Sequence, residues 1–463
     1  MIKIFNQYVP GRKMILFGLE SLFILVVLTV VSAIRMEKSA ASFLMNNVSV
    51  FQLVLVIVTI QVSLYYFDLY DFRAFRSNIE LMIRLLQSLG AATIVLAIIY
   101  FSFPGFMLGR GIFAGSLLFI AVSVVVWRSA YNHILKKRRL DQNILVVGSG
   151  PLAKNIAAEI IDRADTGFKV IGFISKSPER IGEKLVNPSI IGDQTQIVDI
   201  AVKNRVSRIV VAFEDRRAGF PLEQLLDCRM RGIAVEDGIE FYEHLTGKLK
   251  IENLRPSFLI FSGGFRKSRF TTVFKKVSDF VLAGAALTVL LPLIAAVSVW
   301  IKIDSSGPVF YRQERVGEGG KLFKLLKFRS MVNDAESCGP VWAKQDDPRV
   351  TRAGKWLRKL RLDEIPQMIN VLRGEMAFVG PRPERLYFVE TLRKVIPFYD
   401  QRFCVAPGIT GWAQVKYRYG STVEDAAEKL RYDLYYIKNM SLTFDVFIIF
   451  ETLKIVLFGK GAR

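Results

Sequence analysis

Apolar residues dominate the first quarter of the chain, in four stretches that are each about as long as a membrane is thick. The stretches cover residues 14–34, 48–67, 85–103 and 111–127. A helix of about 20 apolar residues crosses the hydrocarbon core of a bilayer, so the pattern predicts four spanning helices within residues 1–140. Glu20 lies inside the first stretch, and we expect its carboxylate to face the other helices or to be hydrated near the interface.

Lysine and arginine residues gather on one side of these predicted helices. They precede the first helix, lie between the second and the third, and follow the fourth: Lys3, Arg12, Lys13, Arg73, Arg76, Arg84, Arg128 and residues 136–139. By the positive-inside bias, the N-terminus and everything after Arg128 are expected in the cytoplasm. The first stretch carries no small-residue cleavage signature, so we expect it to stay in the protein.

A fifth apolar stretch, residues 280–301, contains no charged residue and is also long enough to cross a bilayer. Basic residues flank it on both sides, which favours a cytoplasmic location for both of its ends. Pro292 lies in its middle, where the missing N–H and the ring interrupt a helix. We therefore predict a re-entrant helical hairpin, and the alternative is a kinked helix that spans the membrane.

Between the fourth and fifth stretches, short apolar runs of strand length alternate with helical segments. Strands are predicted at residues 143–147, 168–174, 208–213 and 233–236, with helices from Pro151 and near 195–203 and 221–230. This alternation is typical of a small doubly wound parallel sheet. Residues 141–255 are therefore expected to form a Rossmann-like α/β domain.

Gly148 and Gly150 lie in the turn between the first strand and the first helix of this domain. Glycines at this position let backbone amides approach a phosphate at a helix N-terminus, so they are candidates for cofactor binding. The fingerprint is incomplete, because the second strand ends at Ser175 and Lys176 where a carboxylate is expected. The alternative is that the glycines only allow the strand and helix to pack closely.

Composition and charge narrow the chemistry. The chain has 51% hydrophobic residues and a formal net charge of +21, so it attracts anions. Lipid headgroups and phosphorylated substrates are expected partners, and the membrane-length stretches favour them over nucleic acid. Three cysteines and two histidines in 463 residues indicate neither a disulfide framework nor a His-rich metal centre or Ser-His-Asp triad. Carboxylates and cations must therefore carry any chemistry.

A carboxylate pair stands at the start of a predicted helix in the last third of the chain. Asp363 and Glu364 precede Pro366, which is tolerated in a first helical turn, and Gly374 suits the end of that helix. The helix dipole favours an ionised Asp363. Cations that could hold a diphosphate precede the pair: Arg352, Lys355, Arg358, Lys359 and Arg361. Such a carboxylate could attack phosphorus with the help of Mg²⁺, and the alternative is an ordinary helix N-cap.

Short motifs in a fixed order accompany this pair through the last part of the chain. They are the apolar stretch broken at Pro292, Gly307-Pro-Val-Phe-Tyr-Arg-Gln, Lys327-Phe-Arg-Ser-Met, Leu362-Asp-Glu-Ile-Pro-Gln, Val379-Gly-Pro-Arg-Pro-Glu and Pro407-Gly-Ile-Thr-Gly-Trp. With them, residues 270–463 resemble the catalytic domain of the bacterial polyprenyl-phosphate sugar-1-phosphate transferases, or monotopic phosphoglycosyl transferases. The whole chain resembles the long members that initiate exopolysaccharide synthesis. Leu291 departs from the Ser-Pro pair found in some relatives.

The resemblance implies a reaction and the residues that perform it. Asp363 would be the nucleophile on the sugar-linked phosphate, and Glu364 would bind Mg²⁺ beside it. The residues expected to bind substrate are Lys327, Arg329, Arg358, Arg382 and Glu384. The implied reaction is a ping-pong transfer of a sugar-1-phosphate from a UDP-sugar to undecaprenyl phosphate. It would release UMP first and take place at the cytoplasmic face of the bacterial inner membrane.

The predicted architecture has three parts: four transmembrane helices (1–140), a Rossmann-like domain (141–255), and an α/β catalytic domain with the re-entrant hairpin (256–463). The apolar segment 446–458 would contact the membrane or belong to the soluble core.

One rival function is a membrane-bound nucleotide-sugar dehydratase, against which the missing Tyr-x-x-x-Lys pair argues. Another is a non-enzymatic polysaccharide assembly protein, which leaves Asp363 without a task. No residue selects the sugar, and a homodimer would suit a membrane-surface enzyme of this size.

Overall fold

The computed structural model describes most of the chain, which divides into two compact units. Described residues are 2–4, 6–36, 47–71, 78–107, 110–136, 141–163, 166–213, 220–253, 262–265, 267–332, 347–417, 420 and 422–458. One unit combines Met1–Ile2 with Val9–Gly238, and the other combines Lys3–Tyr8 with Ile239–Arg463. The predicted boundaries at residues 140 and 255, and the basic residues Arg73 and Arg76, lie outside the described residues, so these boundaries stay predictions.

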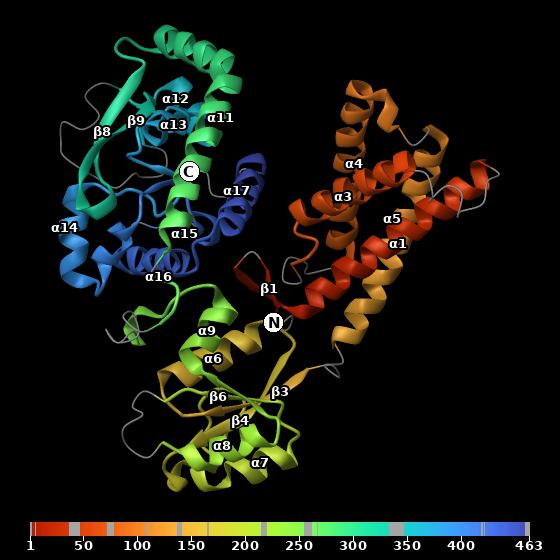
Figure 1. Ribbon diagram of the computed structural model, residues 1–463, viewed down its shortest axis with the longest axis vertical. Helices are drawn as coiled ribbons and strands as arrows, with labels where there is room; N and C mark the ends of the chain where they lie inside the picture. Colours follow the sequence, from red (N-terminus) through yellow and green to blue (C-terminus); the bar gives the residue numbers. More distant parts are fainter. Residues whose placement is uncertain are drawn as a thin grey trace. The chain divides into compact units, whose positions relative to one another are not determined.

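Four long helices form the first part of the first unit (Figure 1). They are α1 (Gly11–Met36), α3 (Asn47–Tyr66), α4 (Asn78–Ser102) and α5 (Arg110–Lys136), with the short helix η1 (Pro104–Phe106) after α4. Each overlaps one of the four predicted apolar stretches. Within the described residues, α1 and α4 are long and apolar enough to cross a membrane, and the apolar parts of α3 and α5 are shorter.

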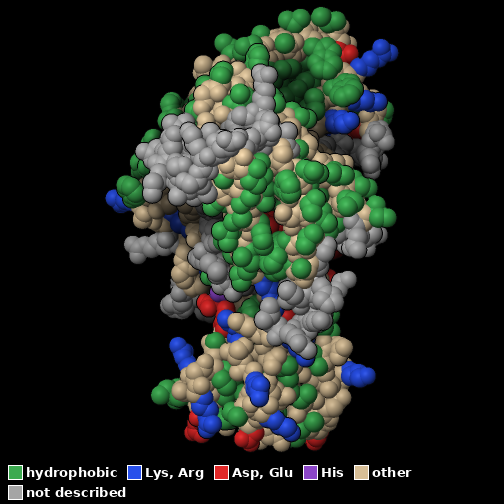
Figure 2. Space-filling view, turned by 90° about the vertical axis from the view of Figure 1, so that its right-hand side faces the viewer, with side chains coloured by type: hydrophobic (Ala, Val, Ile, Leu, Met, Phe, Trp, Pro, Cys, Tyr) green, Lys and Arg blue, Asp and Glu red, His purple; other side chains and the backbone are tan. Residues whose placement is uncertain are grey.

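The outer surface of these helices is apolar. Large side chains such as Leu22, Phe51, Ile94 and Leu118 are half or more exposed, although they stand on long hydrophobic helices. Figure 2 shows hydrophobic side chains gathered on this face with few charged ones among them. Because an exposed apolar surface of this extent is unfavourable in water, it indicates a membrane protein.

Glu20 faces the interior of the helix bundle, which was one of the two predicted arrangements. Its carboxylate is fully buried and lies 2.7 Å from Nε of Arg128 on α5. The Tyr70 hydroxyl donates a hydrogen bond of 2.6 Å to the same carboxylate, and Arg128 also donates to the backbone carbonyl of Leu69. A buried charge is tolerated when it is paired and hydrogen-bonded in this way. The network therefore fixes α1 against α5 and the turn after α3.

A five-stranded parallel sheet completes the first unit, in the order β5-β4-β3-β6-β7. The strands are β3 (Gln142–Val147), β4 (Phe168–Ser175), β5 (Ile190–Asp193), β6 (Arg208–Val211) and β7 (Ala234–Asp237). Helices α6 (Pro151–Asp162), α7 (Ile197–Lys203) and α8 (Leu222–Met230) connect them, and short helices η3 (Pro178–Arg180) and η4 (Gln194–Gln196) flank β5. Leu145 and Val147 pack against α7 and α8. The predicted parallel α/β sheet is confirmed, and β5 is a strand that was not predicted.

The second unit is a mixed α/β body built around several small sheets. Strands β8 (Phe310–Val316) and β9 (Leu322–Phe328) form an antiparallel ribbon, with η6 (Glu318–Gly320) at its turn, and β10 (Ala377–Val379) pairs in parallel with β11 (Gly408–Thr410). The helices are α11 (Arg269–Asp304), α12 (Arg352–Lys359), η7 (Leu362–Glu364), α13 (Gln367–Leu372), α14 (Leu386–Val395), η8 (Tyr399–Cys404), α15 (Trp412–Lys416), α16 (Val423–Asn439) and α17 (Leu442–Leu457). The buried side chains of Trp412, Leu434, Tyr436 and Phe444 lie in its largest core cluster.

The fifth apolar stretch lies within α11, which contains Pro292. Hydrogen bonding makes this a single helical element, and Figure 1 shows its ribbon changing direction sharply within its length. A proline inside a helix produces such a bend, because it removes one hydrogen bond and its ring clashes with the preceding turn. The helix passes the length and composition criteria for a membrane span, and Val289 and Leu291 beside the proline are exposed.

Helix α17 has two apolar faces. Phe444 and Ile448 are buried in the core of the second unit, whereas Val446, Leu453 and Leu457 are more than half exposed. The core interpretation therefore accounts for one face of the segment 446–458. The exposed face leaves the predicted membrane contact as a prediction.

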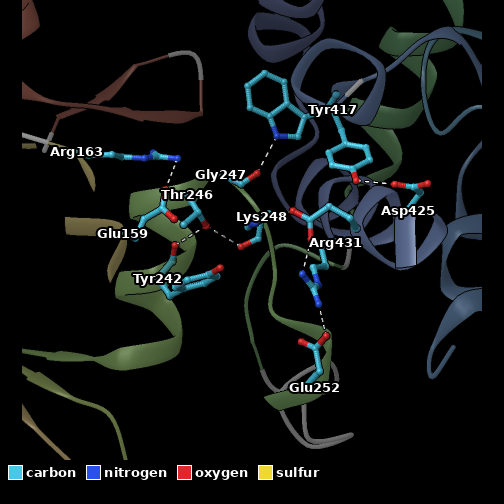
Figure 3. A network of polar contacts seen from close by, with 12 residues as sticks. Glu159, Arg163, Tyr242, Thr246, Gly247, Lys248, Glu252, Tyr417, Asp425 and Arg431 are labelled. Atoms are coloured by element: carbon cyan, nitrogen blue, oxygen red, sulfur yellow. Dashed lines mark hydrogen bonds and ion pairs between the residues drawn. The ribbon is translucent and has the colours of Figure 1, made fainter. Parts of the chain in front are cut away.

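The segment after β7 belongs to the second unit. It comprises α9 (Gly238–Thr246) and η5 (Ile251–Asn253). Figure 3 shows Gly247 and Lys248 of this segment, and Trp412 Nε1 donates a hydrogen bond of 2.8 Å to the Gly247 carbonyl. Lys248 pairs with Glu428 at 2.6 Å, and Leu249 is fully buried in the core cluster around Trp412. Nothing in the hydrophobic pattern indicated that these residues pack with the following domain.

Candidate active site

The carboxylate pair lies in a tight turn between two helices of the second unit. Arg361 adopts a left-handed backbone conformation, with φ of 55°, which ends α12. Asp363 and Glu364 then form η7, and α13 begins only at Gln367. The predicted apolar helix is therefore present, but the pair precedes it. Gly374, with φ of 74°, follows the end of α13 as expected.

Glu364 is held as an anion by arginines. Arg382 Nη2 donates a hydrogen bond of 2.7 Å to its carboxylate, and Arg361 Nη1 lies 3.7 Å from the other carboxylate oxygen. Burial alone would raise the pKa of Glu364, but Arg382, Lys327 and Arg361 outweigh burial and lower it to about 2. The carboxylate is therefore ionised at physiological pH.

Asp363 experiences opposing influences. Only 9% of the residue is exposed, and burial raises the pKa of its carboxyl group, as does the neighbouring charge of Glu364. Lys327, Arg382 and Arg358 act in the opposite direction. The influence predicted from the sequence was the helix dipole, which favours the anion. In the structure, burial and Glu364 outweigh the cations, so the pKa of Asp363 is raised, and the cations are the groups that oppose its protonation.

Lys327 is a cation of this site whose pKa departs clearly from its usual value. It lies near the end of β9, and burial together with Arg382 lowers its pKa to about 8, although Glu364 and Asp363 oppose the shift. The site thus places two carboxylates among four cations: Lys327 from a strand, Arg358 from a helix, and Arg361 and Arg382 from turns. Cations in this arrangement can hold a diphosphate close to a carboxylate that would otherwise repel it.

Comparison with known proteins identifies the family. Residues 270–459 match the family model described as bacterial sugar transferase, and residues 65–218 match one described as a CoA-binding domain. The chain is 33% identical over 362 residues to UDP-glucose:undecaprenyl-phosphate glucose-1-phosphate transferase of Xanthomonas campestris pv. campestris, covering 76% of this chain and 74% of that protein. The chain belongs to the bacterial sugar transferase family.

Two further relatives have similar sequences. UDP-N-acetylgalactosamine-undecaprenyl-phosphate N-acetylgalactosaminephosphotransferase of Aeromonas hydrophila is 43% identical over 250 residues, which cover 54% of this chain and 58% of that protein. UDP-glucose:undecaprenyl-phosphate glucose-1-phosphate transferase of Escherichia coli (strain K12) is 32% identical, and the match covers 69% of this chain and 68% of that protein. The similarity to the Xanthomonas and Escherichia relatives thus extends well beyond the part matched by the sugar transferase model.

Arg329 of this sugar transferase has a different environment from Lys327. It is 5% exposed, and its guanidinium donates hydrogen bonds of 2.8 Å and 2.7 Å to the carbonyls of Ser306 and Ser305, at the end of α11. Strand β9 ends at Phe328, so the alternation of side chains does not continue to Arg329. In this structure Arg329 fixes the end of α11, and its predicted contact with substrate stays a prediction.

Glu384 lies beside the carboxylate site, at the end of the turn that carries Arg382. Its carboxylate is 3.7 Å from Arg315, and its backbone carbonyl accepts a hydrogen bond of 3.0 Å from Val316 on β8. Arg315 is a basic residue of the site that the sequence analysis did not select. The only signal for it was its place in the basic strand that follows Gly307.

The turn that contains Gly148 and Gly150 lies in the first unit of the transferase. Gly148 has φ of 133°, and a Cβ atom on it would lie 2.6 Å from the carbonyl oxygen of Ala212. This close approach of two backbone segments supports the packing interpretation of Gly148. Gly150 is the N-cap of α6 with an ordinary φ of −82°. Binding of a nucleotide at this turn stays a prediction.

The donor groups at the carboxylate pair fit Mg²⁺ as a partial set. Among the residues that the structure describes, no three His, Cys, Asp or Glu side chains form a metal-binding group. Mg²⁺ usually takes one or two carboxylates and completes its shell with water and substrate phosphates. The adjacent carboxylates of Asp363 and Glu364 match this requirement, and the ionised state of Glu364 suits a hard cation.

A cavity of about 530 Å³ elsewhere in the second unit does not include the carboxylate pair. It is lined by residues from the N-terminal segment, α9, the segment before α11 and the turn between α16 and α17, among them Tyr8, Glu243, Lys267 and Lys438. Glu243 and Lys438 pair with each other at 2.6 Å. The carboxylate pair of the transferase, rather than this cavity, carries the groups that suit phosphate chemistry.

Proposed function

We propose that this protein transfers a sugar-1-phosphate from a UDP-sugar to undecaprenyl phosphate, releasing UMP and initiating the synthesis of an exopolysaccharide or related glycan. The observation that carries the proposal is the Asp363–Glu364 pair, largely buried and surrounded by Lys327, Arg358 and Arg382. The names of the relatives in the family support the same chemistry, with glucose or N-acetylgalactosamine as the sugar.

In the first proposed step, a carboxylate oxygen of Asp363 attacks the phosphorus that is bonded to the sugar. The bond from this phosphorus to the bridging oxygen breaks, and UMP leaves with the electron pair of that bond. Lys327 and Arg382 offset the negative charge that accumulates when a carboxylate approaches a diphosphate. The product is a phosphosugar attached covalently to Asp363.

In the second step, an oxygen of undecaprenyl phosphate attacks the same phosphorus. The bond between phosphorus and Asp363 breaks, so the carboxylate is restored and the polyprenyl-diphosphate sugar is released. Glu364 would hold Mg²⁺, which would supply charge neutralisation to the transferring phosphoryl group when it is bound. Arg382 orients Glu364 for this role through their hydrogen bond of 2.7 Å.

The membrane arrangement is part of the proposal. Helices α1, α3, α4 and α5 would be four transmembrane helices, and α11 would be re-entrant, with both ends at the cytoplasmic face of the inner membrane. The bend at Pro292 and the exposed apolar side chains of α11 support this arrangement. It would place the second unit at the membrane surface, where the phosphate of undecaprenyl phosphate and a soluble UDP-sugar can meet.

The test is a screen of nucleotide sugars in membranes that contain undecaprenyl phosphate, with released UMP as the readout. We expect one or a few UDP-sugars to give UMP, and purified protein with that sugar, Mg²⁺ and no lipid acceptor to gain the mass of a phosphosugar on Asp363. Asp363→Asn should gain no mass, because its amide is a poor nucleophile. Full turnover by that variant, or an adduct at another residue, would show that the nucleophile is misassigned.

A further inference from the structure

The turn that carries Arg382 is held through four consecutive backbone carbonyls. The Pro381 carbonyl accepts a hydrogen bond of 2.9 Å from the backbone N–H of Gly408, and the Glu384 carbonyl accepts one of 3.0 Å from Val316. The two middle carbonyls, those of Arg382 and Pro383, accept hydrogen bonds from arginine side chains. Arg402 Nη2 donates to the Arg382 carbonyl at 3.0 Å, and Arg315 Nη1 donates to the Pro383 carbonyl at 3.0 Å.

Two prolines restrict the backbone of this turn. Pro381 and Pro383 have no N–H, so these positions cannot donate a backbone hydrogen bond. Pro383 restricts the preceding residue, Arg382, to extended backbone conformations, and the direction of its carbonyl within that range depends on the group that binds it. A donor to the carbonyl of Arg382 therefore controls the peptide plane next to the Cα atom from which its guanidinium extends.

Arg402 is built to be that donor. It lies on η8, is only 6% exposed, and its Nη2 also pairs with the Asp433 carboxylate of α16 at 2.9 Å. Its Nη1 donates to the Tyr399 hydroxyl at 2.7 Å. Asp433 is 2% exposed, and so large a desolvation of both charges is tolerated only with close pairing. The guanidinium is thereby fixed in one orientation, with one N–H directed at the turn.

The network forms a continuous path to the carboxylate pair. Asp433 orients Arg402, Arg402 binds the backbone of Arg382, and the guanidinium of Arg382 binds Glu364 at 2.7 Å. We infer that Arg402, held by Asp433, is a positioning residue for the transfer reaction. It aligns Arg382 on Glu364 and on the incoming diphosphate without touching either, and this role rests on the function proposed above.

The experiment is a double-mutant cycle between Arg402 and Arg382, measured as kcat and KM for UMP release by the full-length protein in membranes. Arg402→Gln removes the charge and the rigid fork of donors. We expect kcat to fall about 100-fold, because a displacement near 1 Å of a catalytic group has an effect of that size. KM should change less than about threefold, since Arg382 still contributes its charge to substrate binding.

The decisive comparison uses the Arg382→Gln background. If Arg402 acts through Arg382, then Arg402→Gln should lower kcat of that variant by less than about threefold, because the group it aligns is gone. A role in folding alone would reduce kcat by the same factor in both backgrounds. Arg402→Lys keeps the charge next to Asp433 but lacks the fork geometry, so we expect partial recovery over Arg402→Gln.

The matched control is Arg393→Gln, which removes an exposed arginine that pairs with Asp400 at 3.1 Å. It should leave kcat within about twofold of the unmodified protein, since exposed pairs contribute little. Asp433→Asn serves in place of Arg402→Gln if that variant does not fold, and the same non-additivity with Arg382→Gln is expected.

Two outcomes separate the two proposals. Equal reductions of kcat in both backgrounds, or full activity of Arg402→Gln, would overturn the positioning role in a protein that still releases UMP. No UMP release by the unmodified protein with any nucleotide sugar would overturn the proposed function itself.

Discussion

Lys327 should give the transferase an alkaline limit that an ordinary lysine would not produce. Its pKa is about 8, against 10.5 for a lysine in water, because the site is desolvated and Arg382 repels its charge. At pH 9 about one tenth of Lys327 would be protonated, whereas an unperturbed lysine would be about 97% protonated. The charge that offsets the diphosphate would therefore be lost between about pH 7 and 9.

The assay is kcat/KM for UMP release as a function of pH, because this ratio reports the groups of the free enzyme. We expect it to fall above pH 8 in the unmodified protein. Lys327→Arg stays protonated across this range, so its profile should stay level to at least pH 9.5, at a lower maximum because arginine is larger and branched. Lys324→Arg, an exposed position on the same strand, is the matched control and should keep the alkaline limit.

Titration of Lys327 would not unfold the protein at alkaline pH, so unfolding through this residue would not explain a fall in kcat/KM. A lysine whose pKa is lower in the folded than in the unfolded protein binds fewer protons when folded. Its contribution to the free energy of unfolding therefore increases as pH rises from about 8 to 10.5. A level kcat/KM up to pH 10 in the unmodified protein, or an unchanged alkaline limit in Lys327→Arg, would refute the role given to Lys327.

Three further predictions concern the rest of the molecule. Glu20→Ala should lower the free energy of unfolding by about 3 kcal/mol, because it leaves the Arg128 charge buried and unpaired. Glu20→Leu combined with Arg128→Met should lower it by less, and thermal unfolding in detergent measures both effects. Gly148→Ala should destabilise the protein by about 2 kcal/mol, because a Cβ atom meets a backbone carbonyl at positive φ, and a smaller effect in denaturant titrations would contradict the packing role. If α11 is re-entrant, the exposed Cys404 after it and a cysteine introduced at Lys203 should both resist an impermeant thiol reagent in intact cells. Labelling of Cys404 alone would mean that α11 spans the membrane.

Local patterns determined much of the architecture. The long apolar stretches predicted the positions of α1, α3, α4, α5 and α11, since an apolar run of this length pairs its own backbone groups as a helix in a bilayer. Alternating short strands and helices predicted the parallel sheet, because its buried strands are continuous apolar runs. Short motifs of the catalytic domain were equally local, and they singled out Asp363 and Glu364 before their environment was known.

The tertiary structure decided which charged groups meet. Arg382 binds Glu364 from 18 residues away, Arg402 binds Asp433 from 31 residues away, and no periodicity in the sequence relates such positions. Lys327 and Arg329 are two residues apart in one motif, yet β9 ends between them. Lys327 lowers the pKa of Asp363, whereas Arg329 binds the end of α11. Burial also decides protonation, because desolvation depends on what packs around a group rather than on its neighbours in the chain. The sequence thus names the candidate carboxylates, and the fold sets their charge and the cations that face them.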